Sequence, residues 1–479
     1  MIFNSWQYML FLPVVFILYW TIPHRLRWLV LLMGSYFFYA VWSLKYLLLL
    51  VCLSAATFFA AIYIERETKQ RKKKTVFIAI IVICVGILFL FKYLNFFVEN
   101  AEKAFSLLGV HFHIKSLQLL LPVGLSFYIF QMIAYITDVY NGKIHAEHHA
   151  GYYALFTSFF PQLLSGPINR AGSLIPQFHA DRKPDEKMMT EGAKILLRGY
   201  FKKCVIADNL ALFVDRVYGN LPSYRGFSLV LAAVFYSLQI YCDFSGYSDI
   251  AIGSARLFGI RLADNFRQPY LSASIREFWT RWHISLSQWF RDYIYIPLGG
   301  SRVKKTREYL NLLITFLISG LWHGASWTFV LWGAVHGIAQ ILEKLLTGNV
   351  HKKSGHVVEA LKTVFVFALV TLAWILFRAG SIEEAVYVFA HMLDGIHVPA
   401  KYFSDGMLSI VLGRKLLICM ILFWFFPLAG YDIRQKRKES GEHPVMFPAA
   451  KWAFYAFLGL SILMFSPKGV ASDFIYAQF

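Results

Sequence analysis

Long apolar segments dominate this chain and constrain its fold more than any other feature. A helix needs about 20 mainly apolar residues to cross a bilayer, within a range of about 17–25. Because several of the segments are short or interrupted, we expect about ten to twelve transmembrane or re-entrant helices. The sequence therefore predicts an all-α polytopic membrane protein. The segments lie at about 6–22, 28–42, 46–63, 75–97, 119–140, 151–166, 225–245, 309–322, 326–343, 361–377, 409–430 and 449–465.

The composition supports a membrane environment. Hydrophobic residues make up 58% of the 479 residues and charged residues only 16%, against roughly 45–50% apolar residues in soluble domains. A soluble fold of this size would leave much of that apolar surface in contact with water. A bilayer removes this cost, so the composition argues against a soluble enzyme.

Basic residues gather in short loops between the apolar segments. The net charge is +19, and the basic loops include 65–74, 302–307, 344–353 and 434–438. Short cytoplasmic loops are enriched in Lys and Arg, so we place these loops in the cytoplasm and expect membrane lipid, not nucleic acid, around the chain. Counting helices from them places both chain ends outside the cytoplasm. We expect one membrane domain at 1–465 and an extracytoplasmic tail at 466–479.

A histidine between two apolar arms is the strongest site signal. His323 lies sixteen residues after Arg307 and twenty-one before Lys344, or about 24 Å and about 31 Å of helix at 1.5 Å per residue. We therefore expect it deep in the membrane, at the apex of a helical hairpin. An ionisable residue at that depth points to function, and imidazole suits proton transfer. The alternative is a neutral histidine hydrogen-bonded to a neighbouring helix.

A second segment, 276–293, is dense in Arg, Trp and His. Arg276, His283 and Arg291 are candidates to bind a phosphate-rich donor such as coenzyme A or a phosphopantetheine arm, because guanidinium groups bind phosphate strongly. The alternative is an amphipathic helix in the membrane interface, whose tryptophans form an aromatic belt. The residue types alone favour that alternative slightly.

Two further segments place polar residues in apolar surroundings. Asp243 and Asp249 must be paired or solvated there. We expect structural pairing with arginine; orienting a catalytic histidine or lining a donor tunnel are the other readings. In 160–170, Pro161 and Gly166 break a helix, and such breaks at membrane depth usually line cavities. Arg170 is therefore a candidate lining residue.

Several kinds of chemistry lack their sequence signals. No P-loop, no zinc-protease motif and no nucleophile elbow occurs, and paired metal ligands are not evident. The five cysteines include no CxxC pair, and most read as small buried hydrophobes. We expect neither a metal site nor a bound cofactor.

These segments together resemble the membrane-bound O-acyltransferase superfamily, and within it the alginate O-acetyltransferase membrane subunit group. The matching pieces are 241–249, 278–300 and 321–324, and the segments 165–170 and 3–20 fit as well. The likeness covers nearly the whole chain and is most specific at 278–324. It implies a ring of transmembrane helices around a central tunnel, in the cytoplasmic membrane of a bacterium.

The resemblance also implies roles for single residues. His323 matches the catalytic histidine of the superfamily, and His283 matches a second functional histidine of its bacterial branch. The tail 474–479 resembles the FxYxxF-type C-terminal motif of bacterial acyl-relay systems, which implies that Tyr476 transiently carries the acyl group; Ala477 departs from the bulkier aromatic expected there. The residues expected along the substrate and donor tunnel are Trp322, Arg276, Arg291, Asp292, Asp243, Asp249 and Arg170.

The resulting hypothesis is a membrane O-acyltransferase. It passes an acyl group from a cytoplasmic thioester, acetyl-CoA by the resemblance, towards a cell-surface or secreted polysaccharide. His323 is the expected general base on the Tyr476 hydroxyl, because a phenol with a pKa near 10 is a weak nucleophile unless a base takes its proton. The resemblance implies an extracytoplasmic partner with an SGNH-type esterase fold.

Two other functional classes stay open. One is transfer of D-alanine to teichoic acid from an acyl carrier protein, which predicts dependence on that carrier. The other is a non-enzymatic transporter or scaffold, which predicts that function survives the loss of His323.

Overall fold

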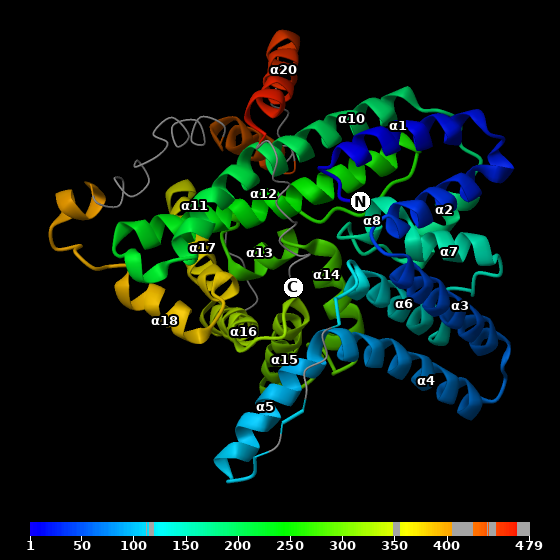
Figure 1. Ribbon diagram of the computed structural model, residues 1–479, viewed down its shortest axis with the longest axis horizontal. Helices are drawn as coiled ribbons and strands as arrows, with labels where there is room; N and C mark the ends of the chain where they lie inside the picture. The colour runs from blue at the N-terminus through cyan, green and yellow to red at the C-terminus, as the bar shows by residue number, and fades with distance from the viewer. Residues whose placement is uncertain are drawn as a thin grey trace. The chain divides into compact units, whose positions relative to one another are not determined.

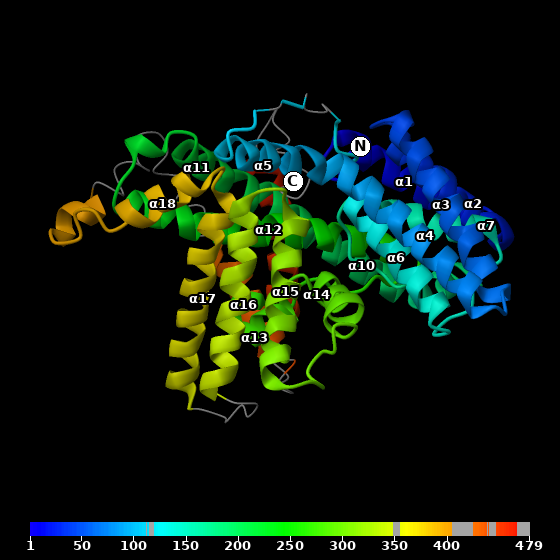
Figure 2. The same ribbon diagram turned by 90° about the horizontal axis from the view of Figure 1, so that it is seen from below.

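Helices account for all the regular structure in the part of the chain that the structure describes. The computed structural model describes residues 1–111, 113–114, 119–347, 355–404, 425–437, 439 and 447–466, and Figures 1 and 2 show its helices in two views. The predicted all-α polytopic class is confirmed. Five helices among the described residues are long and apolar enough to cross a membrane: Leu44–Arg66, Gln70–Leu107, Phe227–Leu257, Trp327–Thr347 and His356–Arg378.

The described chain forms two compact units. The first consists of Met1–Leu196 and Ile250–Ala263. Its helices are α1 (Trp6–Thr21), α2 (His24–Ala40), α3 (Leu44–Arg66), α4 (Gln70–Leu88), η1 (Phe89–Tyr93), α5 (Leu94–Leu107), α6 (Leu125–Tyr140), α7 (Ala150–Ser158), α8 (Phe160–Leu163) and α9 (Ala171–His179).

The second unit consists of Leu197–Asp249 and Asp264–Phe479. Two helices contribute to both units: α10 (Glu186–Tyr200) and α12 (Phe227–Leu257). Residues 425–437 of the second unit are also helical. Its other helices are η2 (Phe201–Ala207), α11 (Asp208–Tyr218), η3 (Leu221–Ser223), η4 (Pro269–Leu271), α13 (Ile275–Arg281), α14 (Ile284–Phe290), η5 (Arg291–Tyr295), α15 (Lys305–His323), α16 (Trp327–Thr347), α17 (His356–Arg378), α18 (Ile382–His391) and α20 (Pro448–Phe465).

Most apolar segments coincide with helices, with two informative differences. The segment predicted at 225–245 continues to Leu257 in α12, because polar residues such as Ser248 and Asp249 do not end a helix that is buried against protein. The segment predicted at 151–166 is interrupted at Phe159, between α7 and α8. Most of the predicted segment 409–430, and the tail beyond Ser466, lie outside the described residues.

The helix α13 is positioned by polar residues at its first turn. Ser274 is the N-cap and accepts a hydrogen bond from the backbone N–H of Glu277 at 3.0 Å. The carboxylate of Glu277 accepts one from the N–H of Ala273 at 2.8 Å, an arrangement close to a capping box. Glu343 of α16 accepts the N–H of Ile275 at 2.6 Å. The start of α13 is therefore tied to the end of α16.

Glycines allow α15 and α16 to pack closely as a hairpin. A Cβ added to Gly333 would collide with the carbonyl oxygen of Phe316, and one added to Gly320 would collide with that of Phe329. Small residues at such contacts let helix backbones approach in a membrane, where packing replaces the hydrophobic drive between helices. In Figure 2, α15, α16 and α17 run side by side.

Replacing Gly333 by alanine is expected to destabilise the protein by about 1–3 kcal/mol, because the added methyl group has no room against the backbone of Phe316. Gly459 is the matched control, since it is also helical but has nothing within 4 Å of an added Cβ. Thermal unfolding of the purified variants measures the difference. Equal unfolding temperatures for Gly333→Ala and Gly459→Ala would contradict the close packing.

Candidate active site

His323 occupies the position that the apolar arms predicted, at the turn of a helical hairpin. It is the last residue of α15, and α16 begins at Trp327. Its side chain is buried, with 2% of the residue exposed. Aromatic rings from three helices surround the imidazole: Trp322 at 4.9 Å between ring centroids, Trp332 at 5.0 Å and Phe377 at 5.3 Å. The ring is held in an aromatic enclosure.

His283 lies between α13 and α14 and is fully buried. Its φ of 42° is unusual for a residue other than glycine. Its Nδ1 lies 3.3 Å from Oδ1 of Asn265. Because an amide oxygen only accepts hydrogen bonds, Nδ1 donates and the neutral ring keeps a lone pair on Nε2. Burial lowers the pKa of His283 below its ordinary value, which favours the neutral imidazole.

The structure brings the two predicted histidines together. The indole of Trp322 separates them, with ring centroids 6.2 Å from His283 and 4.9 Å from His323. Asn265 secures the His283 side of this arrangement, because its Oδ1 also accepts the hydroxyl of Ser285 at 2.6 Å. The two histidines therefore lie on either side of one tryptophan ring, although they are far apart in sequence.

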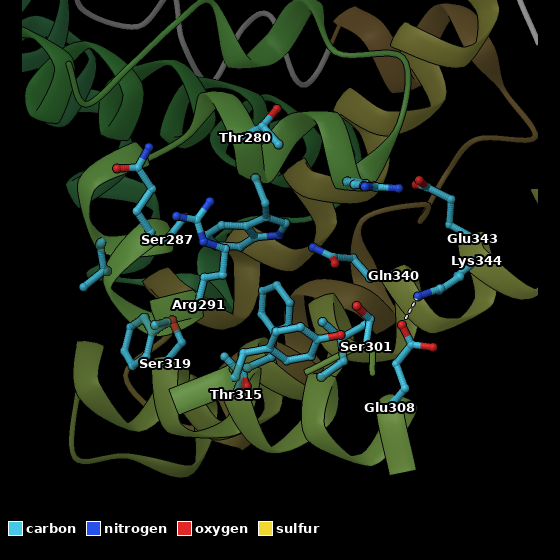
Figure 3. Close-up of a pocket in the computed structure, with 18 of the residues that line it drawn as sticks. Thr280, Ser287, Arg291, Ser301, Glu308, Thr315, Ser319, Gln340, Glu343 and Lys344 are labelled. Atoms are coloured by element: carbon cyan, nitrogen blue, oxygen red, sulfur yellow. Dashed lines mark hydrogen bonds and ion pairs between the residues drawn. The ribbon is translucent and has the colours of Figure 1, made fainter. Parts of the chain in front are cut away.

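A cavity of about 850 Å³ lies along α15 and α16. At one end, Ser319 is one helical turn before His323. At the other end are Lys305 and Thr347, at the basic ends of the two helices. Figure 3 shows Gln340 projecting into the space between the helices. The main lining residues are Arg276, Trp279, Thr280, Ser287, Phe290, Arg291, Ser301, Lys305, Glu308, Thr315, Phe316, Ser319, Gln340, Glu343 and Lys344.

Charged groups line the cavity, and most of them lie at its basic end. The carboxylate of Glu308, 2% exposed, is bound by Lys344 and lies 3.4 Å from Nζ of Lys305. Arg291 lies on the other side of the cavity (Figure 3) and bonds to Asp292 at 2.8 Å. Four cationic residues line the cavity against two carboxylates, those of Glu308 and Glu343. The excess of positive charge suits an anionic ligand.

The predicted tunnel residues are only partly brought together. Arg276 and Arg291 line the cavity, whereas Trp322, Asp292, Asp243 and Asp249 are not among its lining residues. Arg170 precedes α9 in the other unit. Tyr476 lies outside the described residues. The roles assigned to these residues stay predictions.

The prediction that Asp243 and Asp249 pair with arginines was wrong. Asp243 pairs with Lys203 at 2.6 Å and Asp249 pairs with Lys202 at 2.8 Å, so both partners are lysines and not arginines. The reason is the close approach of η2 to α12: a Cβ on Gly246 would lie 3.0 Å from the backbone nitrogen of Lys203. Short separations of this kind let two consecutive lysines reach two carboxylates along α12.

One buried histidine was missed in the sequence. His336 of α16 is fully buried, and Nε1 of Trp279 donates to its Nδ1 at 3.3 Å. The signal was available, because His336 is an ionisable residue inside an apolar segment and meets the criterion that selected His323. Among the described residues, no group of three or more His, Cys, Asp or Glu side chains has a geometry that could hold a metal ion.

One family profile and several known proteins match this sequence. The sequence profile of the membrane-bound O-acyltransferase (MBOAT) family matches residues 143–379. The chain is similar to a protein of Azotobacter vinelandii named "probable alginate O-acetylase AlgI", with 38% identity over 91% of this chain and 85% of that protein. It is also similar to the peptidoglycan O-acetyltransferase of Helicobacter pylori, with 37% identity over 81% of this chain and 79% of that protein.

A third similarity is weaker and shorter. The teichoic acid D-alanyltransferase of Streptococcus thermophilus is 29% identical, over 46% of this chain and 56% of that protein. The O-acetyl-transferring relatives therefore match more of this chain, and at higher identity, than the D-alanyl-transferring one.

Proposed function

Because this chain belongs to the membrane-bound O-acyltransferase family, we propose that it moves an acetyl group from cytoplasmic acetyl-CoA towards a hydroxyl group of an extracytoplasmic polysaccharide. The family makes the chain a multi-pass membrane acyltransferase, which sets aside the transporter and scaffold alternative. The observation that supports the proposal best is the buried His323 one helical turn beyond a cavity with a cationic end.

The cavity supports a thioester donor with phosphate groups. Arg276, Arg291, Lys305 and Lys344 lie along it, and these cations suit the phosphates of coenzyme A. The basic loops 302–307 and 344–353 adjoin the same end of the hairpin, which by the positive-inside rule faces the cytoplasm. The thioester would then extend towards Ser319 and His323.

The chemistry requires one general base and one leaving group. A ring nitrogen of His323 takes the proton of the incoming hydroxyl, and the hydroxyl oxygen attacks the thioester carbonyl carbon. The C–S bond breaks, and the thiolate of coenzyme A takes the proton back from the imidazolium. The aromatic enclosure of His323 excludes water, which disfavours hydrolysis of the thioester.

The tail supplies the hydroxyl in this proposal. Its sequence at 474–479 resembles an acyl-relay motif, so the Tyr476 hydroxyl is the first acceptor and an acetyl-tyrosine ester forms. An extracytoplasmic partner with an SGNH-type esterase fold then takes the acetyl group on a serine and passes it to the polysaccharide. The final acceptor belongs to the class that the relatives name, alginate or peptidoglycan.

Transfer of D-alanine from a carrier protein is the second candidate. It rests on the partial similarity to the teichoic acid D-alanyltransferase. The two candidates differ in donor, so purified protein supplied with either acetyl-CoA or a D-alanyl carrier protein separates them.

Replacing Arg291 by alanine is expected to raise the KM for acetyl-CoA about ten- to a hundredfold, because a hydrogen bond to a charged phosphate contributes about 1.5–3 kcal/mol. Arg267 is the matched control: it is also paired with a nearby aspartate and similarly exposed, 55% against 58%, but it does not line the cavity. Steady-state kinetics in detergent or liposomes measures both. An unchanged KM in Arg291→Ala would remove this residue from donor binding.

A further inference from the structure

His336 makes a hydrogen bond that fixes the side chain of Trp279. The indole Nε1 of Trp279, on α13, lies 3.3 Å from Nδ1 of His336, on α16. His336 is fully buried and Trp279 is 9% exposed. The two rings are nearly perpendicular, at 89°, with centroids 5.0 Å apart. The contact therefore joins α13 to the hairpin at a depth that solvent does not reach.

The chemistry of the two rings determines which atom donates. An indole N–H can only donate a hydrogen bond, so Nδ1 of His336 must accept it. A protonated imidazole has no acceptor, and therefore only the neutral ring with its proton on Nε2 makes this contact. Loss of the acceptor at Nδ1 would release the indole from its orientation.

Trp279 in turn forms part of the cavity wall. It lines the cavity together with Phe316, and the two ring centroids are 5.2 Å apart. Trp279 also packs against Trp332 at 5.7 Å, and Trp332 packs against His323 at 5.0 Å. The orientation of Trp279 therefore shapes the cavity wall, and ring contacts through Trp332 link that wall to His323.

Other rings limit where His336 itself can move. Phe278 stacks with it at an interplanar angle of 5°, with centroids 6.3 Å apart. Trp332 lies 4.9 Å away, one helical turn before it on α16. Because packing holds the imidazole on these sides, its Nδ1 is a fixed acceptor and not a side chain that follows the indole.

We propose that His336 is a positioning residue for donor binding: it holds Trp279 as the wall against which the acyl end of the thioester lies. The inference rests on the proposed function, since it takes the cavity to be the donor site. His336 acts through Trp279 and does not touch the reacting atoms.

The test compares His336→Leu, His336→Asn and Trp279→Phe in steady-state kinetics with acetyl-CoA. His336→Leu and Trp279→Phe each delete the hydrogen bond, and each should raise the KM roughly three- to tenfold, the effect of one neutral hydrogen bond. The kcat should change little. Asparagine keeps an acceptor near the position of Nδ1, so His336→Asn should restore most of the affinity.

The double variant gives the sharper result. If His336 acts through Trp279, His336→Leu adds nothing to Trp279→Phe, because both delete the same interaction. Trp374→Phe is the matched control: it deletes the hydrogen bond from the Trp374 indole to the Tyr270 hydroxyl at 3.2 Å, in the same aromatic cluster but outside the cavity lining. It should lower stability and leave the KM unchanged.

Multiplicative effects of the two substitutions, no rescue by asparagine, or an equal rise in KM for Trp374→Phe would each overturn the inference. His323→Ala is measured alongside, so that a failure of the proposed acetyl transfer can be told apart from a failure of the role of His336. If it still transfers acetyl groups at close to the wild-type rate, His323 is not the base. If the wild-type protein transfers none from acetyl-CoA, the proposed function has failed. If His323→Ala is inactive while His336→Leu keeps the wild-type KM, only the role of His336 has failed.

Discussion

Replacing His323 by alanine is expected to lower the rate of acetyl transfer by roughly 10²–10⁴-fold, the usual contribution of a general base. The residue lies at the end of α15, buried among the rings of Trp322, Trp332 and Phe377, one helical turn beyond the cavity. In the proposed mechanism His323 alone takes the proton from the hydroxyl. The kcat should fall, whereas the KM for acetyl-CoA should change little, because the donor binds mainly at the cationic end.

The control for this prediction is another histidine of the same unit. His391 bonds to Asp394 at 2.8 Å at the end of α18 and does not line the cavity. His391→Ala should transfer acetyl groups like the wild type. Equal membrane insertion and unfolding temperature in both variants would show that the loss in His323→Ala is chemical. Transfer by folded His323→Ala within a factor of two or three of wild type would exclude it as the base.

Replacing Tyr476 by phenylalanine is expected to abolish transfer to the extracytoplasmic acceptor. The tail is apolar for a segment exposed to water: Phe474, Ile475, Tyr476 and Phe479 would each cost roughly 1.5–3 kcal/mol to leave in water. We therefore expect the tail to dock, either at the outer end of the acyl path or in the membrane interface as an aromatic anchor. Phenylalanine keeps the ring and its interfacial affinity but deletes the hydroxyl that would carry the acetyl group.

The two readings of the tail give opposite results. An anchor tolerates Tyr476→Phe, whereas an acyl carrier does not. Mass spectrometry of the C-terminal peptide, with donor present and acceptor withheld, should find the acetyl mass on Tyr476 in the wild type alone. Tyr455→Phe of α20 is the control for removing a tyrosine hydroxyl near the same chain end. Normal polysaccharide acetylation by Tyr476→Phe would leave direct transfer at His323 as the route.

The position of His323 could be predicted because it depends on one-dimensional distances. Two uninterrupted apolar arms with basic ends set the depth of the residue between them, and the hairpin of α15 and α16 has that form. The same reasoning reaches His336, which lies on the second of the two apolar arms. Depth in the membrane is a property that residue spacing determines directly.

The contacts between distant segments could not be predicted in this way. The partners of Asp243 and Asp249 depend on how closely η2 approaches α12. That approach follows from Gly246 and the local π-helical turn, and the aspartates themselves do not indicate it. Likewise, Asn265 supports His283 because the backbone turns back at 264–274, where no periodic pattern exists. Trp322 becomes the ring between two histidines only after the chain brings His283 against the end of α15.

The central claim is that His323 passes an acetyl group from a cytoplasmic donor to an extracytoplasmic acceptor. The most direct test is to supply the donor on one side of the membrane and the acceptor on the other. Labelled acetyl-CoA would be added to inverted membrane vesicles, whose cytoplasmic face is outside, with the acceptor system enclosed. Enclosed acceptor should become labelled in vesicles with the wild-type protein, and at least about a hundredfold more slowly in vesicles with His323→Ala. Labelling at close to the wild-type rate with His323→Ala, or labelling that occurs only when donor is added to the opposite face of the membrane, would contradict the claim.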